Sequence, residues 1–270
     1  MPEAVNLSGV PATMLWTLHN RACESRRPDT YLRDPDCVRV YESIDHDFEG
    51  SFGRPRGSHP MRSRIVDDLL RPWLSRHPGG TVVELGAGLE TQFQRCDDGR
   101  VQWRCVDVPE AIAVRERFLP STDRCRHLAC SALDLSWLDA IDPSRGVFVT
   151  AQGLLMYLDE PSVRGLFVAV VMRLPGVEIV FDTIPPWLSR RSLQGPAQAR
   201  PFQAPPMPWG VARSDIEPLL RGWSDRVTRV TTRSYGEARG RFGALIKVLG
   251  RVPGLRDGLP AITHVQTRPV

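Results

Sequence analysis

The sequence predicts an α/β fold built on a doubly wound, mostly parallel sheet. Short β-branched apolar runs alternate along the chain with helix-like stretches, at the interval expected of βαβ units. The run at residues 81–85 leads into a turn with two glycines, Gly86 and Gly88, and the next run ends near an acidic residue, Asp107. A chain of 270 residues is long enough for one large domain of this class.

Each element is predicted from its local pattern. Residues 61–74 place apolar side chains at helical spacing, and Pro78, Gly79 and Gly80 end that helix. Strands are expected at residues 81–85, 101–108, 127–130, 147–151, 177–181 and 227–232, and helices at residues 109–119, 160–173 and 214–220. Residues 241–252 are basic and apolar. Because glycines interrupt them, we expect a helix packed on the sheet rather than an interfacial membrane helix.

The chain is expected to form a single domain with four parts. Residues 1–60 carry short helical patterns, broken by Pro28 and Pro35, and predict a helical cap. Residues 61–184 hold the core of the sheet, and residues 214–270 complete it. Residues 185–213 combine seven prolines with Trp187 and Trp209. Neither helix nor strand tolerates that proline density, and the aromatic residues favour a lid packed over a pocket rather than a surface loop.

Composition excludes several classes of protein. The net charge is +4, but the basic residues, all arginine except Lys247, are scattered, so no nucleic-acid partner is expected. The six cysteines include no C-x-x-C pair, which argues against a metal site or a disulfide framework. No apolar run approaches the roughly 20 residues of a membrane span, and no signal peptide is apparent. We expect a cytoplasmic protein without a membrane partner, compatible with a homodimer.

The turn after residues 81–85 predicts a nucleoside site. Glycine at Gly86 and Gly88 lets backbone amides approach a ligand, although a tight turn also needs glycine for steric reasons. Asp107 follows Gly88 by 19 residues, where a carboxylate can accept hydrogen bonds from both ribose hydroxyls. The third glycine of the dinucleotide fingerprint is absent, since Thr91 stands in its place. A pyrophosphate cradle is therefore not expected.

Arg62 gives an independent indication of a ligand. At about 100° per residue, it lies on the apolar side of the helix at residues 61–74, whereas Arg64 points to the opposite side. A buried guanidinium requires an anionic partner. That partner is either a core carboxylate such as Glu84 or the carboxylate of an amino-acid-like ligand, which an arginine holds with two hydrogen bonds.

Four blocks of sequence resemble one known family. They are residues 82–91 (VVELGAGLET), 106–110 (VDVPE), 131–138 (SALDLSWL) and 151–158 (AQGLLMYL). Their order and spacing are similar to those of the leucine carboxyl methyltransferase family, and most similar to its bacterial branch of tetracenomycin-type polyketide O-methyltransferases. The resemblance extends from about Leu15 to the C-terminus.

The resemblance implies a class I methyltransferase fold, Rossmann-like with seven strands, that uses S-adenosylmethionine, releases S-adenosylhomocysteine and needs no metal. Arg62 matches the arginine on the methionine carboxylate, Asp107 the ribose carboxylate, and Asp134 with Leu135 the pair at the adenine. The full expected cofactor set is Arg62, Glu84, Gly86, Ala87, Gly88, Asp107, Val108, Asp134, Leu135 and Gln152. The chain departs from the family pattern at three positions: Glu90 replaces an aspartate, Gln92 an arginine, and Gln152 a glutamate near the cofactor's amino group.

The resulting hypothesis is an O-methyltransferase that acts on the carboxylate of a small aromatic or polyketide-like acid. A carboxylate is already ionised at pH 7 and needs no general base, and the sequence places none of the six histidines beside the methyl group, so no catalytic residue is assigned. Arg21, Tyr157, Trp187 and Trp209 are expected at the acceptor. A phenol or other hydroxyl acceptor, and a cofactor-binding protein that does not methylate, remain as alternatives.

Overall fold

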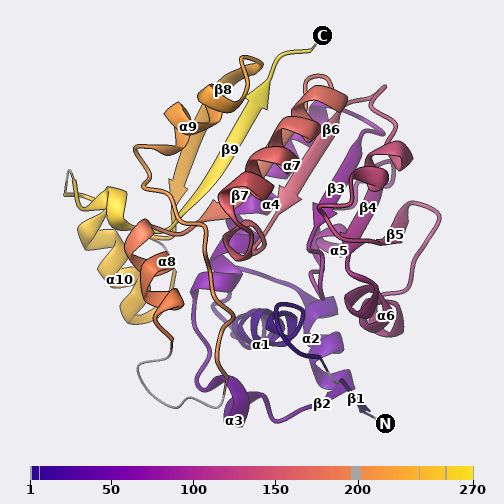
Figure 1. Ribbon diagram of the computed structural model, residues 1–270. Coiled ribbons are helices and arrows are strands. Elements are labelled where there is room, and N and C mark those ends of the chain that lie inside the picture. Colours follow the sequence, from indigo (N-terminus) through magenta and orange to yellow (C-terminus); the bar gives the residue numbers. More distant parts are fainter. Residues whose placement is uncertain (1, 6, 196–201, 237, 253, 270) are drawn as a thin grey trace.

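The computed structural model describes residues 2–5, 7–195, 202–236, 238–252 and 254–269 (Figure 1). Its centre is a seven-stranded sheet in the order β5-β4-β3-β6-β7-β9-β8. The strands are β3 (Thr81–Leu85), β4 (Gln102–Asp107), β5 (Cys125–Ala129), β6 (Val147–Ala151), β7 (Glu178–Thr183), β8 (Val227–Ser234) and β9 (Ala261–Thr267). Strand β9 runs antiparallel to β7 and β8, and the other neighbouring strands of this sheet pair in parallel. The seven-stranded, mostly parallel sheet expected from the sequence is confirmed.

Helices cover both faces of the sheet (Figure 1). Val83 and Leu85 of β3 pack in a cluster with α7 (Glu160–Arg173), α9 (Ile216–Trp223) and the 3-10 helix η1 (Leu135–Ala140). Val82 points the other way, into a cluster with α4 (Ser58–Arg76), α5 (Gln92–Cys96) and α10 (Gly240–Leu249). Because side chains alternate along a strand, Glu84 lies on the α4 side as well.

A third group of helices lies at the edge of the sheet where the parallel strands end (Figure 1). It comprises α1 (Thr13–Ser25), α2 (Pro35–Ser43), α3 (Phe48–Phe52) and α6 (Pro109–Phe118), with the short strands β1 (Glu3–Ala4) and β2 (Ile44–Asp45). Leu15 and Leu18 of α1 pack against Leu89, which follows the glycine turn. The remaining elements are η2 (Leu155–Tyr157), α8 (Pro186–Leu193) and η3 (Arg256–Gly258).

Three details differ from the sequence predictions. Pro35 begins α2 instead of breaking a helix, and the Asp34 carboxylate accepts a hydrogen bond from the Cys37 amide. Pro186 likewise begins α8 inside the segment predicted to have no helix. A proline at the first helical position lacks only an N–H that the helix would leave unpaired, so it favours a helix start. The third difference is β9, which the sequence patterns did not reveal.

The expected lid lies partly outside the described residues, because residues 196–201 are among those not described. Of its described part, Leu188, Ala204 and Met207 line the pocket presented below. Helix α10 buries Ile246 against the sheet and exposes Leu245 and Val248. Among the described residues, no helix is long and apolar enough to cross a membrane.

Candidate active site

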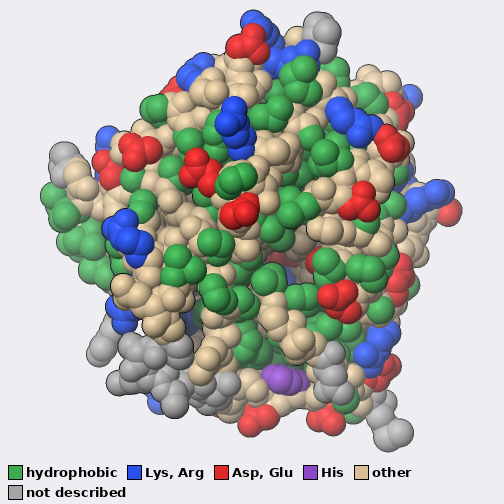
Figure 2. Space-filling view, in the orientation of Figure 1, with side chains coloured by type: hydrophobic (Ala, Val, Ile, Leu, Met, Phe, Trp, Pro, Cys, Tyr) green, Lys and Arg blue, Asp and Glu red, His purple; other side chains and the backbone are tan. Residues whose placement is uncertain are grey.

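A cavity of about 530 Å³ opens at the carboxyl edge of the parallel strands. Its walls come from α1, α4, α8, the glycine turn after β3, and the segments that follow β4, β5, β6 and β7. Hydrophobic side chains gather near the centre of the face that Figure 2 shows, whereas acidic and basic side chains are scattered over it. In open α/β sheets this edge is the usual ligand-binding position.

Asp107 holds the glycine turn from one side. Gly86 and Gly88 both have positive φ, of 65° and 45°, and the Gly88 amide donates to Asp107 Oδ2 at 2.8 Å. The Val108 amide donates to Asp107 Oδ1, also at 2.8 Å. A carboxylate has about four acceptor positions, so Asp107 keeps capacity for two more donors. Burial raises the pKa of this carboxyl.

Arg115 holds the same turn from beneath, a role that the sequence did not reveal. Its fully buried guanidinium donates from Nη1 to the carbonyl oxygens of Gly88 at 2.9 Å and Glu90 at 2.8 Å. The only available signal was an arginine on the inward side of α6, beside Ile112 and Phe118. The turn is therefore fixed before any ligand binds.

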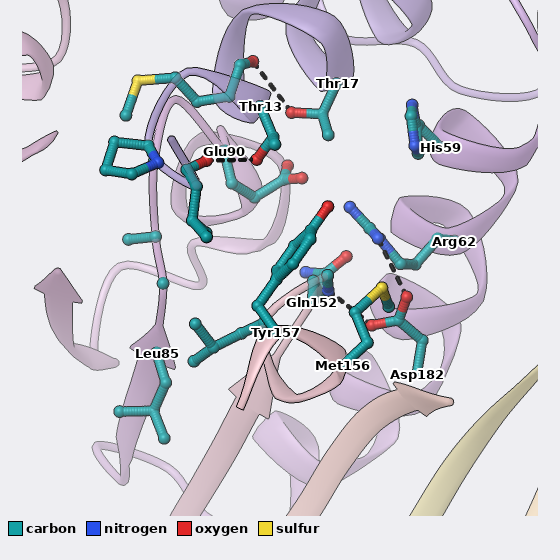
Figure 3. Close-up of a pocket in the computed structure, with 18 of the residues that line it drawn as sticks. Thr13, Thr17, His59, Arg62, Leu85, Glu90, Gln152, Met156, Tyr157 and Asp182 are labelled. Atoms are coloured by element: carbon teal, nitrogen blue, oxygen red, sulfur yellow. Dashed lines mark hydrogen bonds and ion pairs between the residues drawn. The ribbon is translucent and has the colours of Figure 1, made fainter. Parts of the chain in front are cut away.

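Arg62 is buried and Arg64 is exposed, as the helical spacing predicts. The partner of Arg62 is Asp182 at the end of β7, not Glu84: Nη1 lies 3.0 Å from Asp182 Oδ2 (Figure 3). Asp182 Oδ1 also accepts the Gly153 amide at 2.6 Å. Arg62 still lines the cavity, and its buried Nε has no hydrogen-bond partner in the described part of the chain.

Glu84 lines the cavity from within the sheet. Trp103 Nε1 donates to Glu84 Oε2 at 3.3 Å, while Oε1 is buried and has no partner among the residues described. Burial raises the pKa of the Glu84 carboxyl well above its usual range.

Two of the four residues expected at the acceptor are held in the protein interior. Arg21 is not part of the cavity lining, because its guanidinium lies in a buried ion cluster, 2.7 Å from Glu90 Oε1. Trp209 is also buried outside the lining and packs against Phe181. Neither residue therefore lines the cavity in which the acceptor is expected.

Of the other two expected residues, Tyr157 lines the cavity and Trp187 does not. Trp187 is 48% exposed and donates to the Gly258 carbonyl at 2.8 Å. Tyr157 does line the cavity, and its hydroxyl points toward the Arg62 guanidinium (Figure 3).

The two residues expected at the adenine, Asp134 and Leu135, lie outside the cavity lining. Asp134 is exposed and its carboxylate caps η1 by accepting the Ser136 amide at 3.1 Å, and neither it nor Leu135 is part of the lining. Ser131, Ala132 and Leu133 line that part of the cavity instead. A short polar residue before a helix can cap the helix or bind a ligand. In this structure the Asp134 carboxylate caps η1.

One histidine that the sequence analysis did not select lies in the cavity wall. His59 on α4 contacts the ring of Trp16, with ring centroids 4.9 Å apart in a T-shaped arrangement. Burial lowers the pKa of His59 well below its usual range, and nearby arginines lower it further, so it is neutral at pH 7.

A cluster that the cysteine spacing did not predict lies behind the cavity. Ligand atoms of Cys105, Cys125 and His127 come within 4.8 Å of one another. The Arg115 Nε donates to His127 Nε2 at 3.1 Å, so a cation already occupies that ligand position. This arrangement suits a hydrogen-bonded cluster better than a cation site.

Comparison with known proteins identifies the family. Residues 14–171 match the model of the leucine carboxyl methyltransferase family. The chain is also 33% identical over 193 residues, 70% of this chain and 72% of the relative, to the tetracenomycin polyketide synthesis O-methyltransferase TcmP of Streptomyces glaucescens. The chain belongs to the leucine carboxyl methyltransferase family. It is an S-adenosylmethionine-dependent methyltransferase, as the resemblance noted in the sequence implied.

Two further matches are more distant. The S-adenosyl-L-methionine-dependent methyltransferase dpfgK of Gibberella zeae is 26% identical over 182 residues, which is 60% of each chain. The crystal structure of the N-methyltransferase NodS from Bradyrhizobium japonicum WM9 superposes with a TM-score of 0.50 at 16% identity. That match covers 77% of this chain and 97% of that one. At this identity NodS supports the class I methyltransferase fold alone.

Two departures from the expected family pattern lie side by side in the structure. Gln152 Nε2 donates to Gln92 Oε1 at 3.3 Å, and Gln92 Nε2 donates to Asp67 at 2.9 Å. These bonds fix the Gln152 amide so that its Oε1, buried and without a partner in the residues described, belongs to the cavity wall. Two neutral amides thus stand where the family pattern has an arginine and a glutamate, and neither position is left with an unpaired charge.

The third departure, Glu90, belongs to the buried ion cluster. Burial alone would raise the pKa of Glu90, but Arg21 and Arg95, each 2.7 Å from Oε1, lower it to about 2. Ser63 donates to Glu90 Oε2 at 2.9 Å. Glu90 is therefore ionised at pH 7 and joins α1, α4 and α5 at the cavity wall.

Proposed function

We propose that this protein transfers a methyl group from S-adenosylmethionine to the carboxylate of a small aromatic or polyketide-like acid. The observation that carries the proposal is one cavity that unites the glycine turn, Asp107 and Arg62 with an apolar wall. The family membership and the polyketide O-methyltransferase among the relatives support oxygen as the acceptor atom.

The residues present fit the cofactor. Three buried polar atoms that line the cavity have no partner in the described chain: Arg62 Nε, Glu84 Oε1 and Gln152 Oε1. One donor and two acceptors match an amino acid, whose carboxylate needs donors and whose ammonium needs acceptors. Asp107 would hold the ribose hydroxyls, and residues 131–133 would border the adenine.

When bound, S-adenosylmethionine supplies an electrophilic methyl group, which forms a C–O bond with the acceptor's electron pair while the broken C–S bond leaves its electrons on sulfur. The protein aligns the two reactants and excludes water. With a carboxylate acceptor no proton moves, so no general base is needed. The apolar side chains of Met14, Trp16, Leu188 and Met207 would hold the acceptor's rings.

The test is a turnover assay with methyl-labelled S-adenosylmethionine and two matched acceptors, 1-naphthoic acid and 1-naphthol. We expect S-adenosylhomocysteine together with a labelled ester that alkali hydrolyses to volatile methanol. Label only in alkali-stable ethers would overturn the carboxylate assignment. Failure to form S-adenosylhomocysteine with any acceptor of a wider panel, despite cofactor binding, would support a protein that does not methylate.

A further inference from the structure

The hydrogen bonds around Asn20 determine which way its amide points. Its Oδ1 accepts the Arg56 amide at 2.6 Å, and its Nδ2 donates to the Trp16 carbonyl at 3.0 Å. With the amide reversed, its NH2 group would face the Arg56 N–H and its oxygen would face the Trp16 carbonyl oxygen, so both hydrogen bonds would be lost. Asn20 is almost completely buried, so solvent does not compete for these bonds.

The orientation of Asn20 assigns the proton on His59. Asn20 Nδ2 lies 2.7 Å from His59 Nδ1, and since this amide nitrogen is a donor, Nδ1 must be the acceptor. A neutral imidazole carries a proton on one nitrogen only, so the proton of His59 is on Nε2. Burial lowers the pKa of His59, and the positive charges of Arg62, Arg21 and Arg56 outweigh the opposing effect of Glu90.

The Nε2–H group of His59 is the ring donor that Asn20 does not engage. His59 belongs to the cavity lining (Figure 3), whereas Asn20, which holds Nδ1, does not, so Nε2 is the ring nitrogen left for a ligand in the cavity. Nε2 has no hydrogen-bond partner in the part of the chain described. Arg56 also lines the cavity, and among the described residues no carboxylate forms an ion pair with it.

We propose that His59 recognises the acceptor as a hydrogen-bond donor, and that Asn20 selects an ionised acceptor by fixing His59 in the Nε2–H tautomer. One carboxylate oxygen accepts from His59 Nε2 while the other is free to take the methyl group, and Arg56 supplies positive charge at the rim. The Nε2–H tautomer has no lone pair on the cavity side, so it cannot take the proton of a phenol. This inference rests on the proposed function, which it extends from the reaction to the choice of acceptor.

The tautomer can be measured without turnover. Nitrogen-15 chemical shifts of the histidine rings in the full-length protein distinguish Nε2–H from Nδ1–H, with His59→Phe used to assign the signal. We expect Nε2–H in the unmodified protein and Nδ1–H in Asn20→Asp, because an aspartate can only accept from Nδ1. A signal for Nδ1–H or for a doubly protonated ring in the unmodified protein at pH 7 would overturn the proposal.

The consequence for the acceptor is tested by kcat/KM for 1-naphthoic acid. His59→Phe keeps a ring against Trp16 but removes the donor, and we expect kcat/KM to fall about 10- to 100-fold, the usual value of a hydrogen bond to a charged group. The melting shift with S-adenosylmethionine should stay unchanged. His77→Phe is the matched control, because His77 also contacts a tryptophan ring, that of Trp73, but lies outside the cavity lining.

The outcomes separate this inference from the proposed function. If the unmodified protein and His59→Phe methylate 1-naphthoic acid equally well, the role of His59 is wrong and the proposed function stands. If the unmodified protein methylates only 1-naphthol, the proposed function is wrong and this inference with it. In Asn20→Asp, a loss of turnover with 1-naphthoic acid relative to 1-naphthol supports the proposal, and an unchanged ratio of the two overturns it.

Discussion

Arg62 on α4 and Asp182 at the end of β7 form a buried ion pair, with Nη1 3.0 Å from Oδ2. The pair joins a helix on one side of the cavity to the sheet on the other, across 120 residues of sequence. Asp182 accepts from Nη1 of the guanidinium, and Nε is left without a partner in the described chain. A carboxylate that enters the cavity would therefore meet a guanidinium whose direction is already set.

Removing Arg62 should abolish most of the cofactor's effect on stability. At 100 times its dissociation constant, a ligand adds about 2.7 kcal/mol to the free energy of unfolding, and we expect Arg62→Ala to lose most of this increment. The variant also leaves Asp182 unpaired, at a cost of about 3–5 kcal/mol. Differential scanning fluorimetry with and without S-adenosylmethionine measures both effects.

Arg64→Ala is the matched control, because Arg64 is exposed and, among the described residues, pairs with the nearby Asp68 and the Tyr31 carbonyl alone. Adding Asp182→Asn to Arg62→Ala should restore part of the stability but not the cofactor response. Equal loss of the cofactor response in the Arg62 and Arg64 variants would contradict the assigned site.

Gly153→Ala should disturb the same ion pair by a steric route. Gly153 has φ of +69°, and an added Cβ would lie 2.7 Å from Arg62 Nη1. The positive φ alone costs an alanine about 1–2 kcal/mol, and the contact displaces the guanidinium. We expect lower stability and weaker binding of S-adenosylmethionine by calorimetry.

Gly165→Ala on α7 should raise stability, in contrast to Gly153→Ala. A Cβ there meets no heavy atom within 4 Å, so the substitution should stabilise the helix by up to about 1 kcal/mol. If both alanine variants keep full cofactor affinity, the close packing of Gly153 against Arg62 has no functional consequence.

Glu90 should make stability depend on pH in the acid range. Its pKa falls from the usual 4.5 to about 2 on folding, so the ionised form contributes roughly 3 kcal/mol above pH 4.5. This contribution is lost as pH falls from about 4.5 to about 2. Glu90→Gln should therefore be less stable than the unmodified protein at pH 7, and urea unfolding should show the difference shrinking below pH 4.5. A difference that is independent of pH would argue that packing, not charge, is responsible.

Glu84 should make stability depend on pH in the direction opposite to that of Glu90. Burial raises the pKa of Glu84 above 4.5, so as the pH rises past 4.5 the unfolded chain ionises before the folded protein does and is stabilised relative to it. Glu84→Gln should thus be more stable than the unmodified protein at pH 7, with no difference below about pH 4. The same urea titration checks this prediction, which a loss of stability at pH 7 would contradict.

Local patterns in the sequence were enough for the sheet, the glycine turn and the inward face of α4. Val82, Val83 and Leu85 form a strand for reasons contained in a few neighbouring residues, and helical spacing alone separates Arg62 from Arg64. Strand β9 could not be predicted in the same way. It lies between β7 and β8, and its place depends on pairing with strands from two other parts of the chain.

The sequence by itself determined that this chain builds a mostly parallel sheet and which arginine turns inward, because residue spacing within each element controls whether it is a strand or a helix and which way a side chain points. That the sheet is that of a methyltransferase came from the resemblance of four sequence blocks to a known family. Only the tertiary structure decided what each buried charge contacts. It paired Arg62 with Asp182, placed Arg21 against Glu90 outside the cavity lining, and set His59 beside Asn20. Each of these contacts joins distant segments, and the energy of a buried polar group depends on the atoms around it in space rather than on its neighbours in sequence.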